Sequence, residues 1–315
     1  MSQTASSAEQ LTIICSQERR VRHTGVARLV KSYLALTKPK IAALITFTAL
    51  VGTFLATPSF PPWSALIWGT LGIALSCACA ATLNQVFDSR IDASMSRTRG
   101  RPLPRGQVSH RNALAFAAVL GVAGMVIQTL GVNVLTAVLT FASLIGYSVV
   151  YTVWLKHATS QNIVIGGLAG AAPPVLGWAA VTNDIAPQAL VLLLIIFLWT
   201  PPHFWALAIA RRDEYARANI PMLPVTFGVN YTRRQILFYT ILLVLATILP
   251  VLVRMSGIIY LASAFVLDGM FLGYAVRLNQ RNGEALAMRT FKFSVKYLMW
   301  LFAALLTDHY FMFPI

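Results

Sequence analysis

Long apolar runs, separated by short polar segments, make up most of this chain from residue 41 onwards. Each run approaches the ~20 residues that a helix needs to cross the hydrocarbon core of a membrane. The nine runs cover residues 41–57, 65–84, 112–130, 134–153, 163–181, 188–210, 235–253, 257–276 and 293–311. The pattern predicts an all-α polytopic membrane protein with nine transmembrane helices in one bundle around a central cavity.

Two proline pairs lie inside these runs, Pro173-Pro174 in the fifth and Pro201-Pro202 in the sixth. Proline removes a backbone donor and clashes with the preceding turn, so both pairs predict kinks or broken helices. Non-helical backbone at membrane depth is tolerated only where it faces protein or a cavity. We therefore expect both pairs to face the interior of the bundle.

Composition agrees with a membrane protein, because the chain is 57% hydrophobic and only 11% charged. The formal net charge of +15 does not indicate nucleic-acid binding, since the basic residues lie in short loops between apolar runs. Anionic lipid headgroups and an anionic substrate are the partners expected instead. No Gly-rich phosphate loop is present, so the sequence does not support a nucleotide-driven pump.

The distribution of basic residues predicts the orientation. With the N-terminus inside, all 25 Lys and Arg residues except Arg254 fall in cytoplasmic segments or at the adjoining helix ends. Cytoplasmic loops of membrane proteins carry an excess of Lys and Arg. The sequence thus predicts a multi-pass protein of the cell inner membrane, rather than the mitochondrial one, with a cytoplasmic N-terminus and a periplasmic C-terminus.

Residues 1–35 are polar and lack the apolar core of a secretory signal peptide. We expect a flexible cytoplasmic tail over 1–35, with an interfacial segment near residues 26–37. The membrane domain is then expected to cover residues 36–315.

Asn84, Asp88 and Asp92 recur every four positions where the second apolar run ends. On a helix this spacing puts three oxygen-bearing side chains on one face, about 6 Å apart along the axis. Two like charges at this spacing oppose each other unless a cation lies between them. The set therefore predicts a cation site, although charges that pair with neighbouring loop residues are the alternative.

A second acidic pair, Asp213 and Glu214, follows the sixth run. If the bundle brings the two helix ends together, these oxygens complete a site for Mg²⁺, which prefers one or two carboxylates plus substrate phosphates. Arginine and lysine side chains nearby are the expected partners of a polyphosphate. The candidates are Arg97, Arg101, Lys156, Arg211 and Arg212, each of which has lipid headgroups or loop acids as the alternative partner.

His203 is the one histidine deep in a predicted span, in the sequence Thr-Pro-Pro-His-Phe-Trp. It lies eleven positions before Glu214, so the two share a face if the helix continues. A haem ligand, a proton carrier and a contact to a substrate carboxylate are the functional alternatives. A histidine that bonds to backbone freed by the prolines is the structural one.

The two halves of the chain carry similar loops. Arg101-Pro-Leu-Pro104 follows Asp88 and Asp92, and Pro221-Met-Leu-Pro224 follows Asp213 and Glu214. Chance similarity between proline-rich loops is one explanation. A duplicated unit of about four helices is the other, and it predicts that both loops meet at one cavity.

These motifs together resemble the UbiA superfamily of intramembrane prenyltransferases. The Asn84-x₃-Asp88-x₃-Asp92 pattern carries the resemblance to the superfamily. Further stretches resemble its haem-farnesylating branch, over roughly residues 33 to 310. They are Ala35-Leu-Thr-Lys-Pro-Lys40, Tyr151-Thr152, Leu155-Lys156, Thr200 to Ala208, and Pro221 to Pro224.

The resemblance implies a reaction between farnesyl diphosphate and the ring A vinyl group of haem b, with addition of water, to give haem O for terminal oxidases. It implies Asn84, Asp88 and Asp92 as the first Mg²⁺–diphosphate site and Asp213 and Glu214 as a reduced second one. It implies a haem contact for His203 and a catalytic role for Asp88, Asp92 and Lys156. Aromatic residues that would stabilise an allylic cation are Phe87, Tyr147, Tyr151, Phe204 and Trp205.

Two other functions stay open at this stage. One is prenyl transfer to an aromatic acid or quinone precursor. The other is a non-catalytic transporter or haem-handling protein, although transporters place functional charges near the membrane midplane rather than at one edge. Haem A synthase and terminal oxidase assembly factors are the expected protein partners of the favoured function, together with membrane lipids.

Overall fold

The computed structural model describes residues 25–281 and 283–311, and within these ranges it is helical, without a strand. The predicted tail therefore falls largely on residues 1–24, outside the described residues. Of the remainder, Gly25–Leu36 forms a helix that ends where the membrane domain was expected to begin. We refer to Gly25–Leu36 as the N-terminal helix.

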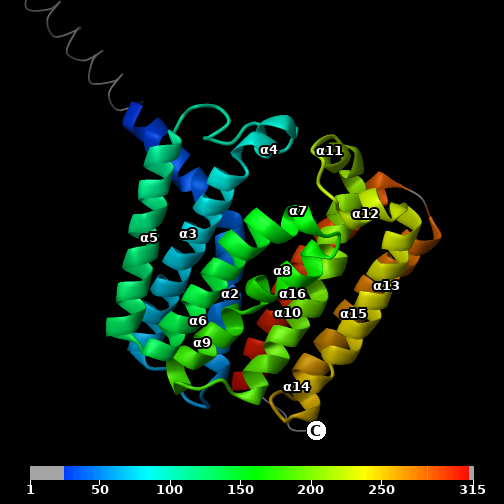
Figure 1. The fold of residues 1–315 in the computed structure, drawn as a ribbon. Coiled ribbons are helices and arrows are strands. Elements are labelled where there is room, and N and C mark those ends of the chain that lie inside the picture. The colour runs from blue at the N-terminus through cyan, green and yellow to red at the C-terminus, as the bar shows by residue number, and fades with distance from the viewer. Residues whose placement is uncertain (1–24, 282, 312–315) are drawn as a thin grey trace, which may run out of the picture.

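The remaining segments follow in chain order (Figure 1). They are α2 (Pro39–Leu55), η1 (Ser64–Gly69), α3 (Thr70–Phe87), α4 (Ser89–Ser94), α5 (His110–Gly131), α6 (Val134–Ile145), η2 (Gly146–Leu155), α7 (Lys156–Ala158), α8 (Asn162–Ala171), α9 (Pro173–Thr182), α10 (Pro187–Ala210), α11 (Arg212–Arg217), α12 (Leu223–Thr226), α13 (Gly228–Ala246), α14 (Leu249–Leu252), α15 (Ile258–Gln280) and α16 (Glu284–Tyr310). The two η segments are π-helical.

By length and composition, seven helical rods in the described ranges can cross a membrane, or eight if the N-terminal helix and α2, bent by 51°, form one broken span. The ninth rod, α16, is 27 residues long but less apolar, because Arg289, Lys292 and Lys296 lie in its first half. These rods correspond to the nine predicted runs. The prediction of an all-α polytopic bundle is confirmed.

The two proline pairs behave differently. Pro173 begins α9 directly after α8 has ended at Ala171, so the predicted break occurs there. Pro201 and Pro202 lie inside α10, which continues without interruption to Ala210. The expected break in the sixth span is therefore absent, and His203 is carried on an intact helix.

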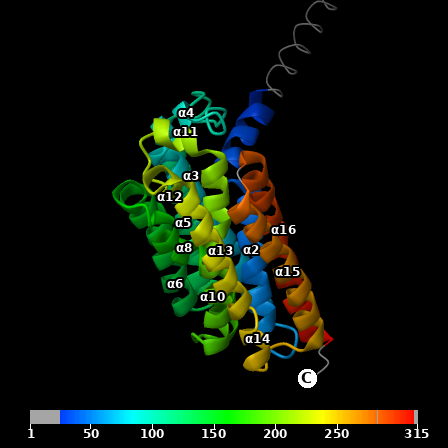
Figure 2. The ribbon, with the colours of Figure 1, turned by 90° about the vertical axis from the view of Figure 1, so that its right-hand side faces the viewer.

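The α4/α11 end of the bundle gathers the N-terminal helix, α4, α11 and α12, whereas α14 lies at the opposite end (Figures 1 and 2). The last residues of α16 also lie far from α4, because His309 Nε2 lies 2.9 Å from the carbonyl oxygen of Thr57, just after α2. Most of the predicted site residues thus face one end of the molecule.

Glycines allow α2 and α9 to pack with their backbones in contact. A Cβ atom at Gly177 would collide with the backbone of Ala49, and one at Gly52 would collide with the backbone of Pro174. Small residues at helix crossings are the usual means of close packing in membranes, where water does not drive association. This contact anchors the start of the chain against the fifth span.

Helix α10 lies in the interior and packs against α8, α9, α13 and α16. Its buried side chains include Leu192, Ile195 and Trp199, which join the largest apolar cluster of the described residues. A helix that is apolar all round is stable only when other helices or lipid surround it. The interior position of α10 brings His203 to within contact of α16.

Candidate active site

Asn84, Asp88 and Asp92 lie on one face at the α4/α11 end of α3. Asp88 is the joint between α3 and α4, with φ −85° and ψ 1°. The helical hydrogen bonds nevertheless continue, from Asp88 N to the Asn84 carbonyl at 2.9 Å and from Asp92 N to the Asp88 carbonyl at 2.8 Å. The predicted shared face is therefore kept across the joint, and all three side chains are buried.

A cation neutralises each of the two buried carboxylates. Lys156 Nζ lies 2.7 Å from Asp88 Oδ1, and Arg101 Nη1 lies 2.6 Å from Asp92 Oδ2. Buried carboxylates are tolerated when they are paired and hydrogen-bonded. Lys156 comes from the end of the fourth span and Arg101 from the loop after α4, so the structure brings together these four predicted site residues.

The Asn84 side chain is held from both sides. Its Nδ2 donates to Asp88 Oδ2 at 3.0 Å and to Thr152 Oγ1 at 3.1 Å. Its Oδ1 accepts a hydrogen bond from Lys38 Nζ at 2.5 Å. The amide orientation is fixed as a result, with its oxygen turned toward a lysine that the sequence did not single out.

Lys38 occupies the break between the N-terminal helix and α2. Burial lowers the pKa of Lys38 to about 7, and the positive charge of Arg101 contributes, while Asp88 and Asp92 act in the opposite direction. An additional anion beside this amine would favour its charged form.

Glu214 links α11 to the segment that follows α4. Its carboxylate accepts from Ser96 Oγ at 2.8 Å, from Ser96 N at 3.0 Å and from Arg211 Nη1 at 2.8 Å. Burial alone would raise the pKa of Glu214, but the hydrogen bonds from Ser96 and the charge of Arg211 outweigh it and lower the pKa. Burial raises the pKa of Tyr215, and the positive charge of Arg97 opposes this rise.

The predicted five-residue metal set is divided in the structure. Helix α10 ends at Ala210 and α11 is a separate helix, with Arg211 at φ −130° between them. Glu214 therefore shares no continuous helix with His203, contrary to the expectation. Asp213 and Arg212 are exposed to the outside, and in the described part of the chain no three His, Cys, Asp or Glu side chains are close enough to hold one ion.

His203 is buried in an aromatic layer. Its ring stacks on Trp199 and Phe291, with ring centroids 4.2 and 4.6 Å apart. Its Nδ1 lies 2.7 Å from Ser294 Oγ, whose single proton is donated to the Phe291 carbonyl at 2.7 Å. With the Ser294 proton on the Phe291 carbonyl, the tautomer consistent with both contacts has the imidazole proton on Nδ1 and the lone pair on Nε2.

The aromatic candidates divide into two groups. Tyr147 and Tyr151 stack with centroids 5.7 Å apart on η2, beside Thr152. Phe87 and Phe204 are 46% and 39% exposed and so face outward in part, whereas Trp205 is buried. The two tyrosines share η2 with Thr152, which binds Asn84, whereas Phe87 lies at the end of α3 beside Asp88.

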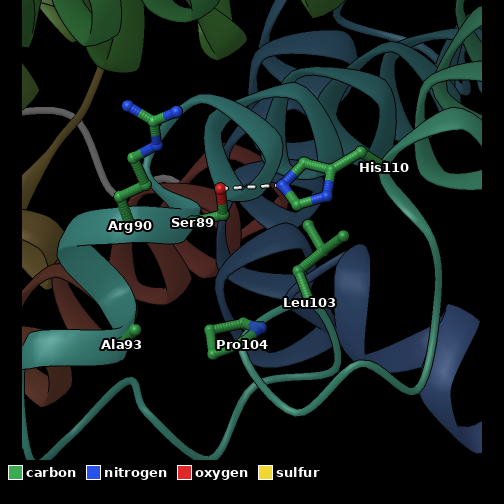
Figure 3. A pocket seen from close by; sticks show the side chains of 6 residues that line it. All are labelled: Ser89, Arg90, Ala93, Leu103, Pro104 and His110. Carbon is green, nitrogen blue, oxygen red and sulfur yellow. Dashed lines mark hydrogen bonds between the residues drawn. The ribbon is translucent and has the colours of Figure 1, made fainter.

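A pocket of about 470 Å³ lies on the other side of α4 (Figure 3). Its lining is Ser89, Arg90, Ala93, Leu103, Pro104 and His110. Ser89 Oγ lies 2.9 Å from His110 Nε2, and the Arg90 side chain points away from this pair. None of the predicted site residues lines this pocket, so it is separate from the carboxylate face.

The donor atoms on the carboxylate face suit Mg²⁺. The amide oxygen of Asn84 and the carboxylates of Asp88 and Asp92 are hard oxygen ligands, and Mg²⁺ commonly takes one or two carboxylates together with substrate phosphates. Three donors do not form a complete cage. These residues fit a metal that is shared with a bound polyphosphate.

Several contacts of the site were not predicted: Lys38, Thr152, Ser96 and Tyr215. Lys38 lies in the Ala35–Lys40 stretch that carries part of the resemblance, but the sequence predicted no role for this lysine in the site. Its left-handed backbone, with φ 49°, was not visible in the sequence. No sequence motif points to Ser96 or Tyr215, because their roles depend on contact between two segments that are distant in the chain.

Comparison with known proteins gives the same assignment. The profile of the UbiA prenyltransferase family matches residues 45–302. The chain is 55% identical over 280 residues to protoheme IX farnesyltransferase of Methylococcus capsulatus, which covers 89% of this chain and 94% of that protein.

Solved structures share the fold. A structure of digeranylgeranylglyceryl phosphate synthase superposes with a TM-score of 0.76 at 19% identity, over 90% of this chain and 99% of that one. A UbiA homologue from Archaeoglobus fulgidus, bound to DMAPP and Mg²⁺, gives a TM-score of 0.62 at 16% identity, over 87% and 99% of the two chains. With its buried Asn84–Asp88–Asp92 face on a helical membrane bundle, the chain belongs to the UbiA prenyltransferase family.

Proposed function

We propose that this protein transfers the farnesyl group of farnesyl diphosphate to the ring A vinyl group of haem b (protohaem IX), with addition of water, to give haem O. The observation that carries the chemistry is the buried Asn84–Asp88–Asp92 face, with Lys156 and Arg101 each bound to one carboxylate. The name of the Methylococcus capsulatus relative supports farnesyl transfer to haem.

The first step is loss of diphosphate from the farnesyl chain. The C1–oxygen bond breaks, its electron pair leaves with the diphosphate, and an allylic cation remains. Mg²⁺ held by Asn84, Asp88 and Asp92 would neutralise negative charge on the leaving group. Lys156 and Arg101 already lie on this face and supply fixed positive charge where that charge develops.

The second step joins the two substrates. The vinyl π electrons of haem form the new bond to C1, which leaves a cation on the vinyl carbon next to the porphyrin ring. Water adds its oxygen to that carbon and loses a proton. The stacked rings of Tyr147 and Tyr151 are the aromatic surface that would stabilise the allylic cation and exclude water until the carbon–carbon bond has formed.

The haem side of the reaction is assigned to α10. His203 presents an unprotonated Nε2 in a layer of Trp199 and Phe291, a setting that suits a flat, apolar macrocycle with a metal at its centre. Haem b is a substrate here and not a resident cofactor.

The four arginines proposed for the diphosphate are not equivalent. Arg101 contacts Asp92, and the positive charge of Arg97, although its side chain is exposed, acts on Lys38 and Tyr215, so both arginines lie near the carboxylate region. Arg211 is engaged with Glu214, and Arg212 is exposed. The geometry favours Arg97 and Arg101 as the main diphosphate contacts. The metal role of Asp213 and Glu214 is correspondingly secondary.

The charge distribution supports a place in the cell inner membrane with the α4/α11 end in the cytoplasm and the C-terminus in the periplasm. Farnesyl diphosphate would then reach the site from the cytoplasm and haem from the bilayer. Haem A synthase and terminal oxidase assembly factors are the partners proposed to receive the product.

Purified protein incubated with haem b, farnesyl diphosphate and Mg²⁺ tests the assignment. The expected product is a porphyrin whose mass has increased by one farnesyl group and one hydroxyl group, detected by mass spectrometry. A phenolic quinone precursor serves as the competing acceptor. Prenylation of the phenol without alkylation of the porphyrin would reject the haem assignment, and the absence of any prenyl transfer would reject catalysis.

A further inference from the structure

Lys38 is the unassigned polar group that lies nearest to the proposed chemistry. Its Nζ lies 2.5 Å from Asn84 Oδ1, and within the described ranges this amide oxygen is its one hydrogen-bond partner. A lysine ammonium has three donors. Two N–H groups of Lys38 are thus left over beside a face that would hold a metal–diphosphate complex.

The backbone of Lys38 is held in an unusual conformation. Its φ of 49° and ψ of 60° lie in the left-handed region, which costs a residue with a side chain roughly 1–2 kcal/mol relative to the right-handed one. The following residue is Pro39, which begins α2 and disfavours the right-handed helical region at position 38. Pro39 therefore disfavours a continuous helix through Lys38, and the left-handed turn that directs this side chain is held by contacts from α3.

Neighbouring residues of α3 hold the turn and its lysine. Gln85 is buried, and its Nε2 donates to the carbonyls of Ala35 at 3.0 Å and Leu36 at 2.8 Å. Asn84, the residue before Gln85, receives Lys38 itself. Two adjacent side chains of α3 thus bind the end of the N-terminal helix, so the position of Lys38 is built into the fold.

Lys38 completes a set of three cations around the same face. Lys156 contacts Asp88 and Arg101 contacts Asp92, whereas Lys38 contacts the neutral amide. Lys38 is the member of the set that does not neutralise a carboxylate by direct contact. The N–H groups of Lys38 can therefore bond to another anion at no cost to a buried acid. Moving Lys156 or Arg101 toward such an anion would leave a buried carboxylate unpaired.

We propose that Lys38 is a further diphosphate-binding residue: its amine, which donates to Asn84 Oδ1, also donates to a diphosphate oxygen of the prenyl substrate. The inference rests on the proposed farnesyl diphosphate chemistry. It adds a cation from the junction of the N-terminal helix and α2 to Arg101 from the loop after α4 and Lys156 from α7.

Binding measurements test this role without turnover. The full-length protein is compared with Lys38→Met, which keeps the length of the side chain but removes its donors, and with Lys38→Arg, which keeps a cation. Lys40→Met is the matched control, because Lys40 is an exposed lysine two positions away. The probes are inorganic pyrophosphate with Mg²⁺, Mn²⁺ alone, and haem b.

Lys38→Met is expected to weaken pyrophosphate binding by about 10-fold or more, the scale of one charge-assisted hydrogen bond. Its affinities for Mn²⁺ alone and for haem b should stay within about 2-fold of the wild-type values, which is under 0.5 kcal/mol. Lys38→Arg should recover part of the loss, and Lys40→Met should bind all three probes normally.

Two outcomes would overturn the role of Lys38. Unchanged pyrophosphate affinity in Lys38→Met would remove its contact to the diphosphate. A parallel loss for all three probes would reduce Lys38 to a structural support of Asn84. Failure of the wild-type protein to bind pyrophosphate with Mg²⁺ is a separate result, which would reject the proposed function together with this inference.

Discussion

The two acidic motifs occupy comparable places in the chain but have different surroundings. Asp88 and Asp92 are buried, and each is bound to a cation from another segment. Of the second pair, Glu214 bridges to Ser96 of the first loop and Asp213 is exposed. Burying a carboxylate costs free energy. A buried carboxylate that is paired with a cation is therefore a candidate for a functional site rather than a surface charge.

The helices that precede the two acidic motifs also differ. The first region places carboxylates at the joint between α3 and α4, whereas the second places a histidine of α10 between aromatic rings. The two regions thus differ in chemistry, ionic in the first and aromatic in the second. Under the proposed function, the first region is the one expected to bind the diphosphate and the second the one expected to bind haem.

The largest effect is expected for the first acidic pair. Asp88→Ala should lower the rate of haem farnesylation by about 10²-fold or more, as expected when an electrostatic catalytic group is removed. Asp213→Ala is the matched control and should retain most activity, since Asp213 is exposed. Turnover under saturating substrates measures both. Equal losses in the two variants would abolish the distinction between the motifs.

An effect on one substrate is expected at His203. His203→Ala should weaken haem b binding by about 10-fold, the scale of losing one buried polar contact, and leave farnesyl diphosphate binding nearly unchanged. Absorbance titration with haem and calorimetry with a non-reactive farnesyl diphosphate analogue give the two affinities. Similar losses for both ligands would place His203 outside the haem site.

The smallest effect is expected where the two loops meet. Glu214→Gln should lower turnover by less than about 5-fold, because the ion pair with Arg211 is partly exposed and such pairs contribute little. A loss as large as that of Asp88→Ala would instead make Glu214 part of the catalytic set.

The pH dependence of the loop contact has a defined sign. The pKa of Glu214 is lowered below its ordinary value of 4.5 in the fold. Its stabilising contribution is therefore complete above pH 4.5 and is lost as the pH falls through the lower, folded value. Thermal unfolding of wild type and Glu214→Gln should differ at neutral pH and converge in acid.

Much of the fold follows from local pattern. Apolar runs of spanning length gave nearly every rod within a few residues, because a helix in lipid must satisfy its own backbone groups and needs a fixed length. Pro201 and Pro202 show the limit of local reasoning. The proline pair predicted either a kink or a break, and only the structure shows that α10 is continuous there.

The candidate site also has one part that local sequence pattern predicts and one part that depends on tertiary packing. The four-residue spacing of Asn84, Asp88 and Asp92 determined their common face, since helical geometry depends only on neighbours in sequence. The expected alignment of His203 with Glu214 did not hold, because it required α10 to continue past Ala210. Whether a helix ends at such a point depends on the packing of both flanking segments.

The sequence by itself thus determined a nine-span helical bundle, a carboxylate face and an accumulation of basic residues at one edge. Only the tertiary structure decided which cation meets each oxygen: Lys156 on Asp88, Arg101 on Asp92 and Lys38 on Asn84. Ion pairs and hydrogen bonds act over a few ångströms between segments that are distant in the chain. Their partners are therefore set by how the helices pack, and no local pattern encodes them.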